Sequence, residues 1–251
     1  MDGFRQKCLG GERLVGVFAS IPHPVAVEVA AAAGPDFLCI DWEHSQFGRE
    51  RIEDLVRASD IHRVPAIVRV PGHAPEQIAA ALDAGAAGVL VPRVATAAQA
   101  RAAVMAVRYP PVGERGVGPG RAAGYGYRIP DYLETANDKI VLAVQVETAE
   151  GLANVREIAA VAGVDIVFVG PGDLSVSIGA MGPDGRDRLN AAISEIAGAT
   201  QAAGRIAGIF RPSADDVAQW AAAGISFFIL ASDAMFLGAS IATAMSAARR
   251  A

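Results

Sequence analysis

The chain alternates between short apolar runs and longer stretches in which alanine and polar residues recur at helical spacing. The short runs are continuously apolar instead of alternating between polar and apolar positions, which is typical of strands buried on both faces. Strands of that kind form parallel sheets covered by helices. The pattern predicts eight of them, at residues 14–19, 37–41, 66–70, 88–91, 141–147, 166–169, 206–209 and 227–230.

The longer stretches predict helices whose ends carry recognisable signals. Thr96 and Ser213 are residue types that cap helix N-termini, and Pro24 and Pro75 suit a first turn. Five glycines each follow an alanine-rich stretch, where a left-handed residue closes the last turn: Gly34, Gly85, Gly163, Gly204 and Gly224. The predicted helices are residues 24–33, 49–61, 75–84, 96–107, 149–161, 186–203, 213–223 and 233–247.

Eight strand–helix units in 251 residues predict an α/β fold, a single (β/α)8 TIM barrel that occupies residues 1–251 as one domain. Because strand–helix alternation does not decide whether a sheet closes, a doubly wound open sheet is the alternative. The one long connection, residues 109–137, is rich in Gly, Pro, Arg and Tyr. It predicts an active-site loop or a subunit contact.

Composition narrows the class of protein. Hydrophobic residues make up 52% and charged residues 20%, which excludes a disordered chain, and the 6% of aromatic residues predicts a core of closely packed small side chains. The net charge of −5 without a basic run argues against nucleic acid as a partner. No apolar stretch is long enough for a membrane span or resembles a signal peptide, so we expect a cytoplasmic protein. Cys8 and Cys39 make no disulfide framework, and we expect Cys39 to be a core thiol.

Polar side chains follow five of the predicted strands at their carboxyl ends. In a barrel these ends meet at one rim, where the active sites of this fold form. A helix cap or a rim ion pair explains any one of these residues, but their recurrence after five strands favours an active site. The residues are Asp41, Glu43, His44, Arg69, Arg93, Gln145, Glu147 and Asp173.

Two of these carboxylates predict a metal site. Glu147 and Asp173 follow neighbouring strands and have no cysteine nearby. They suit a hard divalent cation such as Mg²⁺ or Mn²⁺, whose remaining positions water would fill. Co²⁺ and Zn²⁺ are further candidates.

His44 and Arg69 predict proton transfer and anion binding. His44 is a candidate base because imidazole titrates near neutral pH, and Asp83 could orient it. Arg69 could bind a substrate carboxylate through two parallel hydrogen bonds. Alternatively, it could form a buried ion pair with Asp41 or Glu43.

Lysine usage separates two kinds of carbanion chemistry. Only two of the 22 basic residues are lysines: Lys7 precedes the first predicted strand and Lys139 precedes the fifth. A Schiff-base aldolase needs a lysine on an inner strand, so the sequence instead indicates a metal that stabilises an enolate. The run at 118–123 matches a dinucleotide-binding pattern but follows no strand, so we expect no dinucleotide site.

Several motifs, in order along residues 16–231, resemble the HpcH/HpaI aldolase family of metal-dependent class II pyruvate aldolases, especially its 4-hydroxy-2-oxoheptanedioate and 2-dehydro-3-deoxyglucarate aldolases. They are D-x-E-H at 41–44, R-V-P at 69–71, L-D-A-G-A at 82–86, R-G-V-G at 115–118, Q-V-E-T at 145–148 and G-P-x-D-L-S from residue 170. The resemblance implies a homohexamer whose last helix packs on a neighbouring subunit.

The resemblance also implies a reaction, the reversible cleavage of a 4-hydroxy-2-oxo acid to pyruvate and an aldehyde. Glu147 and Asp173 are implied as the metal ligands, and His44 paired with Asp83 as the acid/base. Asp41 is implied to support the aldehyde end, from the loop region of a neighbouring subunit. The groups implied to contact pyruvate are Arg69, Gln145 and the backbone amides of Gly172 and Asp173.

Two other functions stay open from the sequence. A citryl- or malyl-CoA lyase-like enzyme would act on a CoA thioester, but the arginines between residues 115 and 128 are the sole candidates for its phosphates. A non-catalytic oligomeric binding protein is the third hypothesis. Trp42 and Arg93 stand where the family usually has other residues. These differences leave the identity of the aldehyde open but do not affect the expected enolate chemistry.

Overall fold

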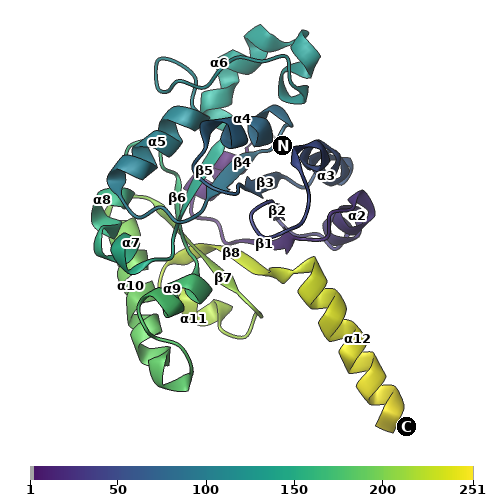
Figure 1. Cartoon of the computed structure of the whole chain (residues 1–251), viewed down its shortest axis with the longest axis vertical. Helices are drawn as coiled ribbons and strands as arrows, with labels where there is room; N and C mark the ends of the chain where they lie inside the picture. Colours follow the sequence, from purple (N-terminus) through teal and green to yellow (C-terminus); the bar gives the residue numbers. More distant parts are fainter. Residues whose placement is uncertain (1–2, 251) are drawn as a thin grey trace.

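The computed structural model describes residues 3–250 and shows a closed barrel of eight parallel strands ringed by helices (Figure 1). Each strand pairs with its neighbours in chain order, and the last closes on the first. The strands are β1 (Leu14–Ala19), β2 (Phe37–Asp41), β3 (Ala66–Arg69), β4 (Gly88–Val91), β5 (Val141–Val146), β6 (Ile166–Val169), β7 (Ile206–Arg211) and β8 (Ile225–Ser232). The predicted (β/α)8 barrel is confirmed, and the open sheet is excluded.

Helices follow the strands as the periodicity predicts, with a few additions. The helices at predicted places are α2 (Pro24–Ala32), α3 (Arg49–Ile61), α4 (Pro75–Asp83), α5 (Ala97–Val107), α7 (Ala149–Ala153), α8 (Val155–Ala159), α10 (Arg186–Ala202), α11 (Val217–Ala222) and α12 (Asp233–Arg250). The additions are α1 (Phe4–Leu9), α6 (Ile129–Lys139), α9 (Pro171–Ser177) and the short 3-10 turns η1 (Arg121–Gly126) and η2 (Pro183–Gly185). The long connection predicted at 109–137 therefore contains η1 and most of α6.

The predicted helix ends are mostly correct. The Thr96 side chain accepts a hydrogen bond from the Gln99 amide and forms a capping box at the start of α5. All five of the predicted glycines have a positive φ, between 68° and 98°. Ser213 is not an N-cap: α11 begins at Val217 after Asp216, and the Ser213 hydroxyl bonds to Asp215 instead. The predicted helix at 149–161 is two helices, because Asn154 interrupts it.

Two layers of apolar side chains form the core. Between the strands and the helices, the layer consists mainly of Ala, Val, Ile and Leu, as the composition predicts. Inside the barrel the prediction of small side chains is wrong in part, because phenylalanines pack there among Ala, Cys, Val, Ile and Leu side chains. Phe37 and Phe227 stack with ring centroids 4.2 Å apart, and Phe168 meets Phe227 edge-on. The barrel interior below the carboxyl rim is therefore a packed core and leaves no channel.

The amino-terminal end of the barrel is closed by a buried ion network. Asp165, 1% exposed, accepts hydrogen bonds from Arg5, Arg108 and the Leu142 amide at 2.7, 2.9 and 2.9 Å. Lys7 lies in α1 and Lys139 ends α6, so both lysines precede their strands and lie away from the carboxyl rim. This placement agrees with the exclusion of a Schiff-base mechanism.

The last helix, α12, stands apart from the barrel (Figure 1). None of its residues is buried, and apolar side chains along it are exposed: Met235, Phe236, Leu237, Ile241 and Met245. In the described part of the chain, no helix is both long and apolar enough to cross a membrane.

Candidate active site

Five of the eight polar residues predicted at the carboxyl ends of the strands line one cavity of about 390 Å³, and Glu43, Arg93 and Glu147 are not part of its lining. Its lining comes from strands around the barrel or from the residues directly after them, which is the usual place of chemistry in this fold. The lining residues are Phe18, Ser20, Asp41, His44, Arg69, Gln145, Phe168, Gly170, Pro171, Gly172, Asp173, Phe210, Ser232 and Met235.

Arg69 is held at the base of this cavity by two carboxylates. Asp41 and Arg69 are register partners on β2 and β3, and Arg69 donates to Asp41 through Nε at 2.9 Å and Nη2 at 2.7 Å. Glu43 Oε2 lies 3.4 Å from Arg69 Nε. The Phe18 ring stacks on the guanidinium at 4.3 Å. Burial lowers the pKa of Arg69, but the bonds and charge of Asp41 outweigh it, so Arg69 is a fixed cation.

The ion pair that the sequence left as an alternative role for Arg69 is therefore present. It also places Asp41 in a definite position. The Asp41 carboxylate binds Arg69 of its own chain and accepts a bond from the His44 backbone amide at 3.2 Å. Within one chain, Asp41 thus shapes the cavity through Arg69 and the start of the 42–48 loop.

Glu147 is a buried carboxylate whose neighbours are uncharged donors. It is 2% exposed, and its carboxylate accepts a bond from the Arg93 amide at 2.8 Å and another from the Gln145 side chain. A Cβ at Gly170 would lie 2.6 Å from Glu147 Oε2 and 2.8 Å from Gln145 Nε2. Glycine at position 170 is therefore required for the end of β6 to approach this pair so closely.

Three carboxylates repel one another on this side of the cavity. Burial raises the pKa of Glu147, and the charges of Glu43 and Asp173 raise it further, although the two hydrogen bonds oppose the shift. Burial likewise raises the pKa of Glu43, with Asp41 and Asp173 adding to it and Arg69 opposing. Mutual repulsion of this kind indicates a surplus of negative charge that Arg69 alone does not balance.

The residues fit a divalent cation. Glu43 Oε2 and Gln145 Oε1 are buried without a hydrogen-bond partner, so oxygen ligands are available beside the repelling carboxylates. Residues 3–250 contain no group of three His, Cys, Asp or Glu side chains arranged to hold a metal. A hard cation bound by two carboxylates keeps several water ligands, so a third protein ligand is not needed.

His44 lies on the open side of the cavity. Its side chain is 60% exposed, and Nε2 is 3.7 Å from Glu43 Oε2. It therefore faces solvent on one side and the carboxylates on the other. The sequence predicts no role for Glu43 beyond an ion pair. The structure adds its half-buried position between Arg69 and His44.

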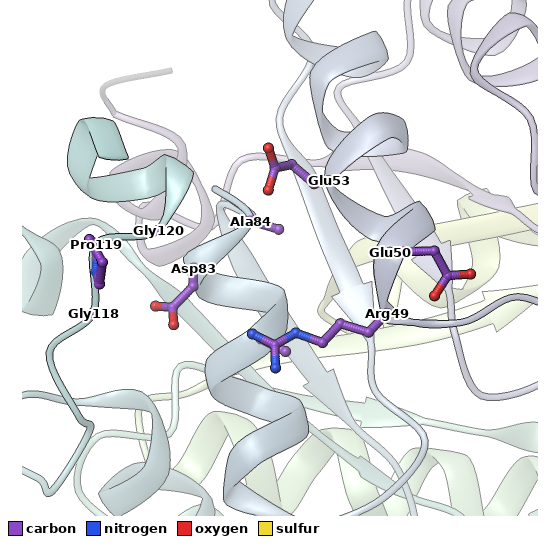
Figure 2. A pocket seen from close by; sticks show the side chains of 9 residues that line it. Arg49, Glu50, Glu53, Asp83, Ala84, Gly118, Pro119 and Gly120 are labelled. Atoms are coloured by element: carbon purple, nitrogen blue, oxygen red, sulfur yellow. The ribbon is translucent and has the colours of Figure 1, made fainter. Parts of the chain in front are cut away.

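Asp83 does not line this cavity. It ends α4 and accepts a bond from Arg115 Nη2 at 2.7 Å. Figure 2 shows its side chain in a different pocket, between the 118–120 segment and Arg49 at the start of α3. The sequence-based pairing of Asp83 with His44 is therefore not formed within one chain.

The remaining predicted residues lie on α9. Gly172 and Asp173 occupy its first turn, where backbone amides lack partners inside the helix. Both residues line the cavity and are exposed. The N-terminus of α9 thus presents free amides and one carboxylate to the same space as Arg69.

Sequence reasoning missed the opposite wall of the cavity. It consists of Phe18, Ser20, Phe210, Ser232 and Met235, from β1, β7, β8 and the first turn of α12. No signal could have identified the aromatic residues, because an apolar residue in a buried strand is indistinguishable from core. Ser20 and Ser232 each lie at a strand end. A charged or amide side chain is conspicuous there, but a serine is not, because serine is also a common turn residue.

Comparison with known proteins gives a consistent match. A family model described as HpcH/HpaI aldolase/citrate lyase matches residues 14–239. A hydroxypyruvate/pyruvate aldolase from Paraburkholderia phytofirmans is 40% identical over 231 residues, covering 89% of this chain and 88% of that protein. A 4-hydroxy-2-oxovalerate aldolase from Novosphingobium aromaticivorans is 38% identical, covering 90% of this chain and 87% of that protein.

Solved structures agree. An HpcH/HpaI aldolase/citrate lyase family protein from Burkholderia cenocepacia has a TM-score of 0.93 at 36% identity and covers 99% of this chain and 100% of its own. A citrate lyase beta subunit from M. tuberculosis, complexed with oxaloacetate and magnesium, has a TM-score of 0.60 at 20% identity, covering 91% of this chain and 95% of its own. The second likeness shows the fold alone.

Proposed function

The chain belongs to the HpcH/HpaI aldolase/citrate lyase family, and from this membership we propose that it is a class II pyruvate aldolase, a carbon–carbon lyase. The reaction is the reversible cleavage of a 4-hydroxy-2-oxo acid to pyruvate and an aldehyde. The observation that carries the proposal is the cavity at the carboxyl rim that brings Arg69, His44, Asp41 and Asp173 together, with the buried Glu147 carboxylate directly beside Gly170 of its lining.

Glu147 and Asp173 are proposed to hold a divalent cation, with Mg²⁺ or Mn²⁺ preferred by oxygen ligands. When bound, the cation polarises the 2-keto oxygen and stabilises the negative charge of the enolate. The Gln145 side chain and the Arg93 amide fix the orientation of the Glu147 carboxylate. Such supporting hydrogen bonds set the geometry of a metal ligand.

Arg69 and the start of α9 are proposed to bind the pyruvate portion of the substrate. Because Arg69 uses Nε and Nη2 to bind Asp41, its Nη1 is left to donate to the substrate. The amides of Gly172 and Asp173 suit the substrate carboxylate, since helix N-termini favour anions. Gln145 completes this side of the site.

His44 is proposed to move the proton. In the cleavage direction it takes the proton from the C4 hydroxyl, the C3–C4 bond breaks, and its electron pair moves into the enolate as the aldehyde forms. Arg69 stabilises the oxygen on which negative charge develops. Protonation of the enolate at C3 then gives pyruvate. Asp41 holds Arg69 in place, and Glu43 Oε2 lies 3.7 Å from His44 Nε2.

The test of this function is pyruvate release from 4-hydroxy-2-oxo acids before and after removal of metal with a chelator. We expect release to disappear on chelation and to return with Mg²⁺ or Mn²⁺. A CoA thioester serves as the competing substrate. Release that survives thorough metal removal, or cleavage of the thioester alone, would contradict the proposal.

We also propose that α12 is exchanged between subunits of a homo-oligomer. A barrel needs a helix over the outer faces of β8 and β1, where Val15, Val17 and Leu230 are only partly buried. The helix that follows β8 leaves this place and exposes its own apolar side chains (Figure 1). A neighbour's α12 could cover the gap, and exchange of one element is a common route to oligomers.

A further inference from the structure

The carboxylate of Asp233, the first residue of α12, is the acceptor of four hydrogen bonds. Its Oδ1 accepts from the Ser20 amide at 2.9 Å, from the Ser20 hydroxyl at 2.6 Å and from the Ala234 amide at 2.8 Å. Its Oδ2 accepts from the Ile21 amide at 3.1 Å. One side chain therefore fastens the segment after β1 to the first turn of α12.

The backbone before Asp233 directs the chain into this contact. Ala231 has a φ of +46°, a left-handed conformation that costs free energy for a residue with a Cβ. The Ser232 hydroxyl accepts a bond from the Met235 amide at 3.2 Å and closes the first turn. The start of α12 is thus held in one orientation by Asp233 although none of the helix is buried.

Asp233 joins one cavity residue, Ser20, to the start of α12, where its chain neighbours Ser232 and Met235 also belong to the cavity. Ser20, Ser232 and Met235 line it, together with Phe18 and Phe210. They come from β7, β8 and β1, three consecutive strands of the closed barrel, and from the residues that follow them. The charged groups come from β2 and β3 and from the ends of β5 and β6. The cavity therefore has a charged side and an uncharged side with aromatic rings, a thioether and two hydroxyls.

This division indicates which side of the cavity binds each part of the substrate. On the proposed function, the 2-oxo carboxylate portion binds at the charged side, so the carbon chain beyond C4 extends toward the uncharged side. That wall suits an uncharged aldehyde, which makes apolar contacts and accepts a hydrogen bond from the Ser232 hydroxyl, since the Ser20 hydroxyl already donates to Asp233. An aldehyde bearing a carboxylate would meet no cation there except Arg69, which stacks on Phe18 and is already paired with Asp41, because no other arginine or lysine belongs to the described lining.

We propose that Asp233 is a positioning residue that fixes this aldehyde-side wall, and that the wall selects uncharged aldehydes. Without the carboxylate, the Ser20–Ile21 segment and the Met235 turn are no longer joined. The wall then loosens while the charged side keeps all its own contacts. The change should therefore affect the aldehyde and leave pyruvate binding unaltered.

The experiment compares wild type, Asp233→Ala and Asp233→Asn in the condensation direction, with pyruvate and either acetaldehyde or the bulkier benzaldehyde. An asparagine keeps the Oδ1 acceptor and loses only the acceptor for Ile21. We expect the alanine variant to raise the KM for acetaldehyde about tenfold, with a smaller rise for asparagine, since each net hydrogen bond contributes modestly. The KM for pyruvate should stay within about twofold.

Selectivity gives a second readout. The wild-type preference for acetaldehyde over benzaldehyde should narrow in Asp233→Ala, and succinic semialdehyde should remain poorer than acetaldehyde in both. Asp187→Ala is the matched control, because Asp187 is an exposed aspartate in the first turn of α10. It should leave both KM values unchanged.

Several outcomes would overturn the proposal. They are an unchanged aldehyde KM in Asp233→Ala, an equal rise in both KM values, or a rise that appears only when light scattering shows dissociation of the oligomer. If Asp233→Ala does not fold, Ser20→Ala removes one bond from the other side and should raise the aldehyde KM about threefold; no change would count against the proposal. A wild-type enzyme that forms no carbon–carbon bond would refute the proposed function instead.

Discussion

Arg69 and Glu147 carry opposite charges at the same rim of the barrel, and each has different partners. Arg69 is bonded to Asp41 and has Glu43 nearby, whereas Glu147 has only an amide and the Gln145 side chain. The unbalanced charge therefore lies at Glu147 and Asp173, on the side of β5 and β6. This asymmetry is the reason for placing a cation there.

His44→Ala should separate proton transfer from metal binding. We expect aldol cleavage to fall by about 10² to 10⁴, the usual contribution of a general acid or base. Divalent metal affinity, measured by calorimetry, should be unchanged, because His44 is not a proposed ligand. Glu147→Ala is the complementary variant and should abolish metal binding. A fully active His44→Ala enzyme would show that another group moves the proton.

Gly170→Ala should disable the site through crowding alone. The added Cβ would displace the Glu147 carboxylate and the Gln145 amide, which lie within 2.8 Å of its position. We expect activity to fall by about 10²-fold, the scale of a misplacement near 1 Å. Gly198→Ala is the control, since a Cβ at that position in α10 meets nothing within 4 Å. Equal activity of the two variants would rule out this account of Gly170.

The charged side of the site could be predicted from the sequence, and the rest could not. A polar residue that ends an apolar strand is conspicuous, so the hydrophobic pattern alone singles out Asp41, Arg69 and Gln145. Met235 gave no signal, because it begins an amphipathic helix. The location of Asp83 could not be predicted either, since its partner Arg115 lies within the long connection, where no periodicity sets the spacing.

Helices and strands with a strong hydrophobic periodicity were predicted from the sequence. Helices that depend on tertiary contacts were not. The eight strands are continuous apolar runs, and the alanine-rich helices end at glycines. By contrast, α9 has seven residues with one glycine and two serines, which are poor helix formers. It forms because Pro171 starts it and Leu174 is buried. The helix α6 is mostly polar, and only Ala136 is buried, with Tyr132 and Leu133 packed against the core, so its apolar stripe is short.

The exposed face of α12 predicts the assembly. Ile241→Asp places a charge among apolar side chains that we propose to be buried against a neighbour, and it should dissociate the oligomer. Light scattering measures the mass directly. Ile61→Asp is the control, because Ile61 is a 68% exposed residue at the end of α3. A wild-type chain that is monomeric at micromolar concentration would contradict the exchange of α12.

At the scale of the whole molecule, barrel closure is what creates the site. Residues from Phe18 to Met235 line one cavity because eight parallel strands bring their carboxyl ends to one rim. The amino-terminal end is closed by Asp165 and its arginines, and the interior by phenylalanines. Chemistry is thus confined to one end, with charge on one side and an uncharged wall on the other.

The central claim is that this rim forms the enolate of pyruvate with the help of a divalent metal. It is tested most directly by exchange of the pyruvate methyl protons in D₂O, followed by NMR, because this reaction needs no knowledge of the natural aldehyde. We predict that the wild-type enzyme with Mg²⁺ or Mn²⁺ deuterates the methyl group, and that the chelated enzyme and Glu147→Ala do not. Exchange at an undiminished rate after metal removal would contradict the account.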